Sequence, residues 1–131
     1  MTTRSVTIDG GLARASLPGD SILSPAPTVI ATDANDTITV AKILSRFLQY
    51  TGFTAGRTLT TDTAVNILAA LPDLNIGEAV TMIVSCVAAF AGTYAAGTGV
   101  TLAGRATTPA SSYSLVVITK LSTTTVEWRV A

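Results

Sequence analysis

The sequence predicts a mainly β domain, an antiparallel sandwich or barrel-like fold with one or two short helices and an extended N-terminal arm. Two observations support this prediction. From about residue 79 onward, short runs of β-branched and aliphatic residues alternate with glycine-rich or polar turns, which is typical of sandwiches and barrels. The first part of the chain is instead punctuated by glycine and proline and keeps no periodicity for long. We therefore expect an arm over residues 1–34 and a β-rich domain over residues 35–131.

The arm is expected to contact other subunits, because it is too aliphatic to remain solvated. Pro25 and Pro27 favour an extended backbone there, and residues 5–8 could form a short strand. The aliphatic side chains expected at an interface are Val6, Ile8, Leu17, Ile22 and Val29. A disordered tail is the alternative interpretation of this segment.

Two helical segments are predicted after the arm. Apolar residues of the first recur at helical spacing: Val40, Ile43, Leu44, Phe47 and Leu48. Thr39 is its expected N-cap, and residues 36–39 are a short strand or a helix entry. The second segment covers residues 61–71, with Thr61 as the expected N-cap and Pro72 just after its end.

The rest of the chain is predicted to form strands, at residues 79–87, 93–94, 100–102, 113–120 and 125–130. The strands at 79–87 and 113–120 are apolar on both faces, which predicts burial between two layers. The last strand alternates between apolar and polar residues, with Trp128 on the apolar side. Trp128 is predicted to pack in the core or to anchor an interface.

The composition favours a subunit whose surface is covered by partners. The 131 residues are 48% hydrophobic and only 12% charged, against roughly 25% charged residues in an ordinary soluble domain. Large exposed apolar patches usually mark interfaces. The formal net charge is zero and no basic stripe occurs, so no nucleic-acid partner is expected. The most hydrophobic stretch, residues 79–91, is too short to span a membrane, and no signal peptide is expected at the N-terminus.

No catalytic, cofactor or metal site is predicted, and the chain is not expected to be an enzyme. Histidine is absent, which removes the commonest general base and metal ligand. Asp33, Asn35 and Asp36 resemble the start of a calcium-binding loop, but the positions of its glycine and glutamate hold Ile38 and Leu44. Turn and cap roles are therefore expected for these three residues.

The remaining reactive or charged side chains are also given structural roles. The glycine-rich stretch at 92–99 lacks the ending of a phosphate-binding loop, so a hairpin turn is expected there. Cys86 lies in an apolar run and is expected to be a small buried hydrophobe; with no partner for a disulfide, it is consistent with synthesis in a reducing cytoplasm. Arg57, Arg105 and Arg129 are expected at the rim of subunit contacts, because a guanidinium can bridge carboxylates or carbonyls between chains.

Two stretches resemble a known family of proteins. The sequence RTLTTDTAVNILAALP at 57–72, followed by IGEAV at 76–80, is similar to a pattern in virion proteins of tailed bacteriophages. So is AAGTGVTLAG at 95–104, which precedes two closing strands in such proteins. The resemblance is to trimeric capsid decoration (cement) proteins and related head and tail fibre modules. It covers about residues 37–131, and IDGG at 8–11 and LPGD at 17–20 extend it more weakly.

The resemblance implies a β-rich homotrimer on the outer surface of a phage head, with the major capsid protein as its partner. It also implies one short helical turn that runs into a strand near residue 45. We therefore expect a helix at 40–44 and leave 45–50 open. A trimeric head or tail fibre or baseplate module that contacts the host is the alternative function. A small-molecule-binding barrel or enzyme is the third and least favoured class.

Overall fold

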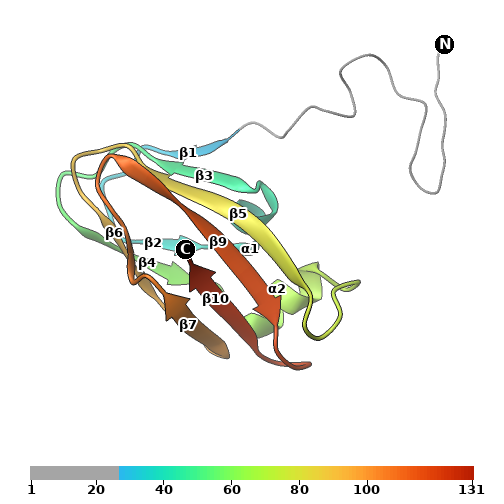
Figure 1. Ribbon diagram of the computed structural model, residues 1–131. Coiled ribbons are helices and arrows are strands. Elements are labelled where there is room, and N and C mark those ends of the chain that lie inside the picture. Colours follow the sequence, from blue (N-terminus) through green and yellow to red (C-terminus); the bar gives the residue numbers. More distant parts are fainter. Residues whose placement is uncertain (1–26) are drawn as a thin grey trace, which may run out of the picture.

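Two β-sheets packed face to face form the part of the chain that the computed structural model describes, residues 27–131 (Figure 1). The six-stranded sheet has the order β1-β3-β5-β9-β10-β7, and the four-stranded sheet has the order β2-β4-β6-β8. The strands of the larger sheet are β1 Thr28–Ile30, β3 Phe47–Tyr50, β5 Ala79–Cys86, β7 Val100–Gly104, β9 Ser112–Lys120 and β10 Val126–Val130. Those of the smaller sheet are β2 Asp36–Ile38, β4 Arg57–Thr61, β6 Gly92–Ala95 and β8 Thr107–Thr108. The prediction of a mainly β sandwich with two short helices is confirmed.

The chain changes sheet after each of its first eight strands, so β1 to β9 alternate between the two sheets. From β1 to β6, two reversals of direction separate strands that are successive within one sheet, and such strands therefore run parallel. This accounts for the parallel pairs β1–β3–β5 and β2–β4–β6. Antiparallel pairs form at β5–β9, β9–β10 and β6–β8. The sheets are thus mixed, whereas the short strands and glycine turns had suggested antiparallel hairpins.

Helix α1 (Val40–Leu44) ends earlier than its apolar periodicity predicts. Arg46 adopts a left-handed backbone with φ of 68°, which ends the helix in the manner usually provided by glycine. The chain then continues as β3, in which Leu48 and Tyr50 are buried and Phe47 lies on the opposite face. The open segment at 45–50 is therefore a helix end followed by a strand.

Helix α2 (Ala64–Ala70) begins two residues later than expected. Its N-cap is Thr63, whose hydroxyl oxygen accepts a hydrogen bond from the backbone N–H of Asn66 at 3.2 Å. The expected cap, Thr61, is instead the last residue of β4. Because both threonines precede the apolar run, the sequence pattern alone could not separate them.

One carboxylate satisfies backbone donors at the start of both helices. Asp62 accepts hydrogen bonds from the backbone N–H of Val40 at 3.1 Å and from that of Thr63 at 2.8 Å. Thr39 occupies the N-cap position of α1 as predicted, but its side chain makes no capping hydrogen bond. A residue distant in the sequence therefore takes over the role expected of a local cap.

The core lies between the sheets and contains Trp128. Its largest fully buried side chains are Trp128, Tyr50, Ile38, Leu48, Leu59 and Ile67. The Trp128 ring lies 6.1 Å from the ring of Tyr94, which comes from the opposite sheet. Trp128 had been predicted either to pack in the core or to anchor an interface. Because it is 0% exposed, it packs in the core and cannot contact another chain. Cys86 is also fully buried, and burial raises the pKa of its thiol.

The two most apolar strands, β5 and β9, are buried on one face only within the chain. Met82 and Val84 of β5 and Val116 of β9 point into the core, whereas Leu115 and Tyr113 are 43% and 70% exposed. The prediction that both strands are covered on both sides is therefore wrong for a single chain. Sequence cannot tell which neighbour would cover the second face, since an apolar run has the same pattern whether its cover comes from its own chain or another.

The glycine-rich run joins β6 in one sheet to β7 in the other, so the expected hairpin is an arch between sheets. The backbone N–H of Gly97 donates to the hydroxyl of Thr61 at 2.8 Å. A Cβ at Gly97 would lie 2.5 Å from the carbonyl oxygen of Thr61 and 2.6 Å from that of Asp62. Only glycine allows the arch to pack this closely against the end of β4.

The domain begins earlier than the predicted boundary at residue 35. Residues 28–30, assigned to the arm from the sequence, form the edge strand β1 and pair in parallel with β3. A three-residue strand after two prolines is too short to give a periodic signal. Val29 lies on it and is exposed. The other arm residues expected at an interface, Val6, Ile8, Leu17 and Ile22, lie outside the described residues.

We predict that Gly97→Ala lowers the free energy of unfolding by about 1–3 kcal/mol, because the added methyl group overlaps two backbone carbonyls. Urea denaturation at a fixed protein concentration, followed by Trp128 fluorescence, measures this change. Gly56→Ala is the matched control, since its Cβ would meet nothing closer than 3.9 Å and should change stability by less than about 1 kcal/mol. Equal effects of the two substitutions would contradict the role given to Gly97.

Candidate interaction surface

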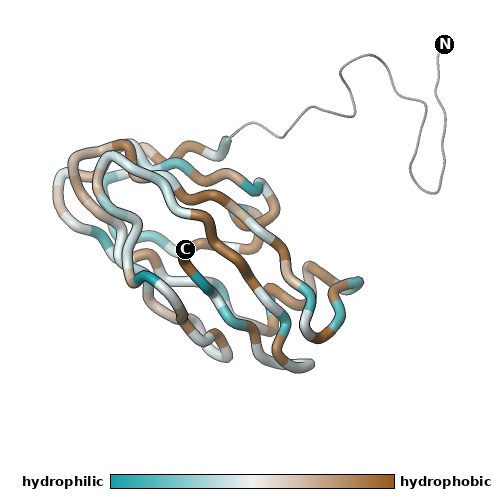
Figure 2. Tube along the Cα trace, in the orientation of Figure 1, coloured by the Kyte–Doolittle hydropathy of each residue, from teal (hydrophilic) through white to brown (hydrophobic). Residues whose placement is uncertain are grey.

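The outer face of the six-stranded sheet has an apolar centre. The strand register aligns Phe47 of β3, Ile83 of β5 and Leu115 of β9 in one row across the sheet. Tyr113 and Val117 lie beside this row on the same face, because alternate residues of a strand share a side. Figure 2 shows that the hydrophobic runs concentrate on the central strands β5 and β9. We call Phe47, Ile83, Tyr113, Leu115 and Val117 the apolar face.

Tyr113 projects between two shallow hollows of the apolar face. One hollow is lined by Phe47, Ile83, Ser85 and Tyr113. The other is lined by Ser85, Val87, Ser111, Ser112 and Tyr113. Their volumes of about 260 and 270 Å³ fall below the roughly 300–1,000 Å³ of typical small-ligand sites. The relief of the face therefore suits contact with another surface better than enclosure of a small molecule.

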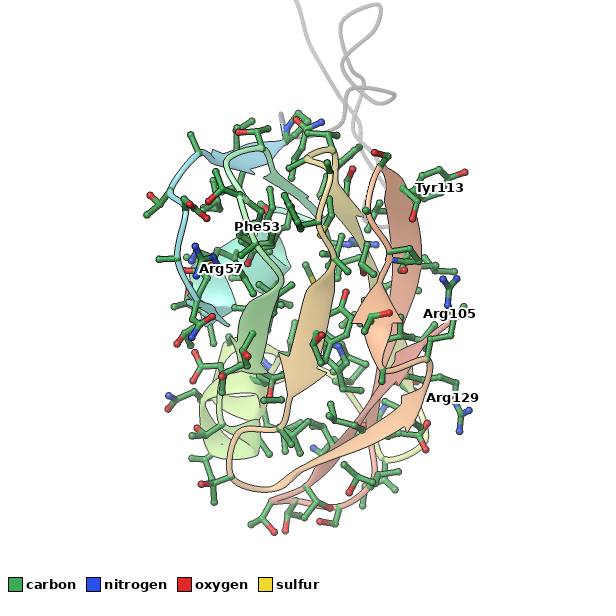
Figure 3. All side chains as sticks on the ribbon, turned by 90° about the vertical axis from the view of Figure 1, so that its left-hand side faces the viewer. Phe53, Arg57, Arg105, Tyr113 and Arg129 are labelled. Carbon is green, nitrogen blue, oxygen red and sulfur yellow. The ribbon has the colours of Figure 1, made fainter. Side chains whose placement is uncertain are left out.

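Two of the three arginines predicted at a contact rim lie around the apolar face. Figure 3 shows Arg105 and Arg129 projecting from the same side of the sandwich as Tyr113. Arg129 pairs with Glu127 at 3.1 Å. Arg46, which was not predicted, also borders the face and donates from Nε to the backbone carbonyl of Thr81 at 2.7 Å. The rim is therefore more basic than the chain as a whole.

Arg57, the third predicted rim residue, lies on the opposite side of the molecule (Figure 3). Its guanidinium pairs with the carboxylate of Asp33 at 2.7 Å. This pair links the loop after β1 to the start of β4. Arg57 therefore has an intramolecular role in the described chain.

The outer face of the four-stranded sheet differs from the apolar face. Its outward positions carry hydroxyl groups in place of aliphatic side chains, from Thr37, Thr58, Thr60, Thr93 and Thr107. The strand register pairs Thr58 of β4 with Thr93 of β6, and Thr93 with Thr107 of β8. Threonine suits a pleated surface and keeps a hydroxyl available to water. The sandwich thus has one apolar and one hydroxyl-bearing outer face.

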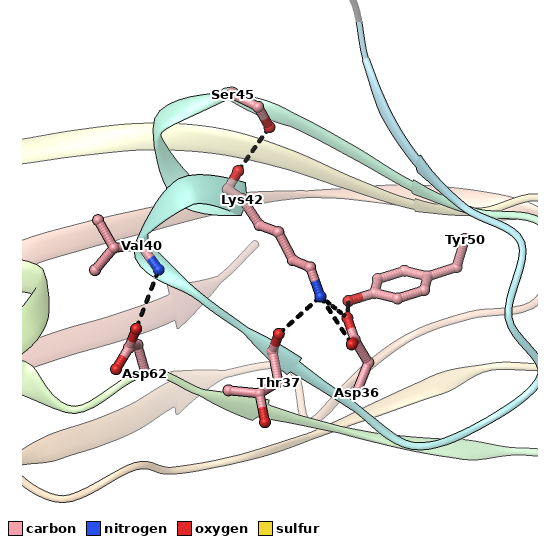
Figure 4. Close-up of polar contacts among 7 residues, drawn as sticks. All are labelled: Asp36, Thr37, Val40, Lys42, Ser45, Tyr50 and Asp62. Carbon is pink, nitrogen blue, oxygen red and sulfur yellow. Dashed lines mark hydrogen bonds and ion pairs between the residues drawn. The ribbon is translucent and has the colours of Figure 1, made fainter.

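The acidic cluster at 33–36 cross-links the fold. Asp33 accepts hydrogen bonds from the backbone N–H of Thr54 at 3.0 Å and from its hydroxyl. Asn35 accepts from the backbone N–H of Thr58 at 2.9 Å. Asp36 binds Lys42 at 2.6 Å and the hydroxyl of Tyr50 at 2.7 Å (Figure 4). Each side chain has its own partners, and these lie 6 to 24 residues away in the sequence. The cluster therefore joins distant segments, whereas local turn and cap roles had been predicted.

Tyr50 is held in the neutral state by this arrangement. Its ring is buried and stacks on Phe53 at 5.0 Å between ring centroids. Burial and the hydrogen bond to Asp36 raise its pKa well above the ordinary value for tyrosine. Tyr50 therefore serves as a hydrogen-bond donor that joins the core to the Lys42–Asp36 ion pair.

The described part of the chain contains no group of three or more His, Cys, Asp or Glu side chains that could hold a metal ion. Neither helix within residues 27–131 is long and apolar enough to cross a membrane. The apolar face combines an aligned row of apolar side chains with two hollows, and it is the candidate interaction surface of the described domain. Sequence reasoning missed it because Tyr113, Leu115 and Val117 had been assigned to a strand covered on both sides.

We predict that Asp33 makes stability depend on pH between about 4 and 2. Hydrogen bonds from the side chain and backbone of Thr54, and then from Arg57, lower its pKa from 3.8 to about 2. A depressed carboxylate pKa stabilises the fold above the unfolded value, and this contribution is lost as the pH falls through the folded value. Thermal unfolding of wild type and Asp33→Asn should therefore differ more near pH 6 than near pH 2. An equal difference at both pH values would contradict this role.

No protein-family model matches this chain, and the comparisons with curated proteins and with solved structures found no match either.

Proposed function

We propose that this chain is a structural virion protein, a capsid decoration (cement) protein that binds the outside of a phage head as a homotrimer. The observation that carries the proposal is the apolar face, in which Tyr113 and Leu115 are exposed and Phe47, Ile83 and Val117 are partly exposed, in a chain with only 12% charged residues. Contiguous exposed apolar surface of this kind marks a protein contact. Self-association would remove it from water.

The sequence motifs support a phage head as the site of assembly. The run at 95–104 resembles decoration proteins, and in the structure it forms the glycine arch and strand β7. The arch is needed for the fold, so this part of the resemblance concerns architecture. The partner, by the same resemblance, is the major capsid protein on the virion surface.

The proposed mechanism is multivalent attachment. Each subunit of a trimer contributes one modest contact with the capsid, and the linkage of three contacts gives a far higher avidity than any one of them. We propose that residues 1–26, with Val6, Ile8, Leu17 and Ile22, supply part of this contact. Linked contacts across neighbouring capsid subunits would resist outward pressure from packaged DNA.

We predict that the chain sits on the heads of particles made by the phage that encodes it, and that it increases their resistance to heat. Immunogold labelling of purified particles tests the location. Heads that lack the protein should release DNA at a lower temperature than wild-type heads, and added purified protein should restore the wild-type temperature. Label on the tail would overturn the head assignment in favour of the fibre or baseplate alternative.

We also predict that deletion of residues 1–26 reduces binding to heads at least about tenfold while the domain stays folded. The deletion stops before β1, because removal of residues 28–30 would take away an edge strand of the sheet. Co-sedimentation of the full and the shortened protein with undecorated heads measures the difference, and circular dichroism checks the fold. Unchanged head binding would remove these residues from the mechanism.

A further inference from the structure

Most charged side chains of the described chain have a partner within it. Three ion pairs are formed, by Lys42 with Asp36, Arg57 with Asp33 and Arg129 with Glu127. Other charged groups bind the backbone, as Lys120 does at the carbonyl of Leu74. Among residues 27–131, Arg105 and Asp73 have neither a hydrogen bond nor an ion pair through their side chains and are exposed.

These two residues belong to different surfaces of the molecule. Arg105 follows β7 and projects on the side of the apolar face (Figure 3). Asp73 lies after α2 and lines a hollow of about 310 Å³ together with Ala70, Leu71, Pro72, Leu74 and Val80. This α2–β5 hollow is apolar except for Asp73, and the exposed carboxylate Glu78 lies in the same connection between α2 and β5.

The two surfaces differ in charge and in relief. The apolar face presents the projecting ring of Tyr113 with arginines at its rim. The α2–β5 hollow is concave and lined by Asp73, and Glu78 is exposed in the same connection. The ammonium of Lys120 binds the carbonyl of the lining residue Leu74, so two carboxylates accompany one cation there. A partner that carries a surface like the α2–β5 hollow would cover the apolar face. Every copy of this chain carries both surfaces, so a second copy can be that partner.

A symmetric face-to-face contact is less favourable. It would bring the basic rims of two apolar faces together, so that Arg46 and Arg105 of each copy approach those of the other. Like charges across a contact are repulsive. A head-to-tail contact instead places the basic rim of one copy against the acidic hollow of the next, and such heterologous contacts close into rings when the rotation fits.

We propose that the apolar face of one copy docks on the α2–β5 hollow of a second copy, and that three such contacts close the trimer. The occupant of the apolar face is thus a sister chain and not the capsid. This inference rests on the proposed homotrimer and assigns its contact surfaces. The threonine-bearing face of the four-stranded sheet lies outside this contact.

The apolar part of the contact is tested by Leu115→Asp and Tyr113→Asp, with Thr93→Asp on the opposite outer face as the matched control. Sedimentation equilibrium of the full chain should give a trimer for wild type and Thr93→Asp, and monomers for the other two variants at micromolar concentration. Tyr113 is the more exposed of the two target residues, so its variant remains informative if Leu115→Asp fails to fold. Folded monomers support the proposal, and trimers formed by both variants would overturn it.

The direction of the contact is tested by charge reversal. Arg105→Glu and Asp73→Arg should each weaken trimer association roughly tenfold. The double variant should recover most of the loss, because the reversed charges face each other again across the head-to-tail contact. If the losses of association free energy in the two single variants simply add in the double variant, the proposed pairing of these surfaces is wrong.

The same variants separate this inference from the proposed function. Monomeric Tyr113→Asp should bind undecorated heads more weakly, because linked attachment is lost. If wild type is trimeric and binds heads but Tyr113→Asp stays trimeric, the assigned contact is wrong while the decoration function stands. If wild type is trimeric through these residues but ignores heads, the contact stands and the decoration function is wrong.

Discussion

The crossing of the chain between two sheets after each of the first eight strands is the constraint on which this structure depends. From β1 to β6 it accounts for the parallel pairing within each sheet, since two crossings restore the direction of the chain. It also requires tight arches, and Gly97 meets this requirement by packing its Cα against the backbone of Thr61 and Asp62. Asp62 in turn binds backbone N–H groups at the start of both helices, which fixes the connections that lead from the smaller sheet to the larger.

Features set by local chemistry could be predicted from the sequence, and features set by distant partners could not. The β class, the strand with Trp128 and the presence of a helix that begins at Val40 follow from periodicity. The end of α1 does not, because Arg46 adopts a left-handed backbone without glycine while its side chain binds Thr81, 35 residues away. The cap from Asp62 on Val40, the parallel pairing and the strand at 28–30 depend in the same way on residues that come together only in the folded chain.

The candidate surface illustrates a more specific limit. The run at 115–118 predicts a strand covered on both sides, and within one chain Val116 and Ile118 are buried while Leu115 is exposed. Under the proposed self-association, the pattern describes the assembled protein, because the second covering layer comes from another copy. Sequence periodicity reports how much of a strand avoids water. It does not report which chain provides the layer that covers the strand.

The contrast between the two outer faces has a consequence for any assembly. A subunit that associates through one outer face has to keep the opposite outer face wettable, since two adhesive faces would lead to continued stacking. Of the two outer sheet faces in this domain, that of the six-stranded sheet carries the large apolar side chains, while that of the four-stranded sheet carries a register of threonines. Threonine has the β-branched shape that strands favour, yet its hydroxyl stays hydrated. The low charge of the chain therefore need not make its whole exterior adhesive, because hydroxyl groups can keep one face in water where charged side chains usually do so.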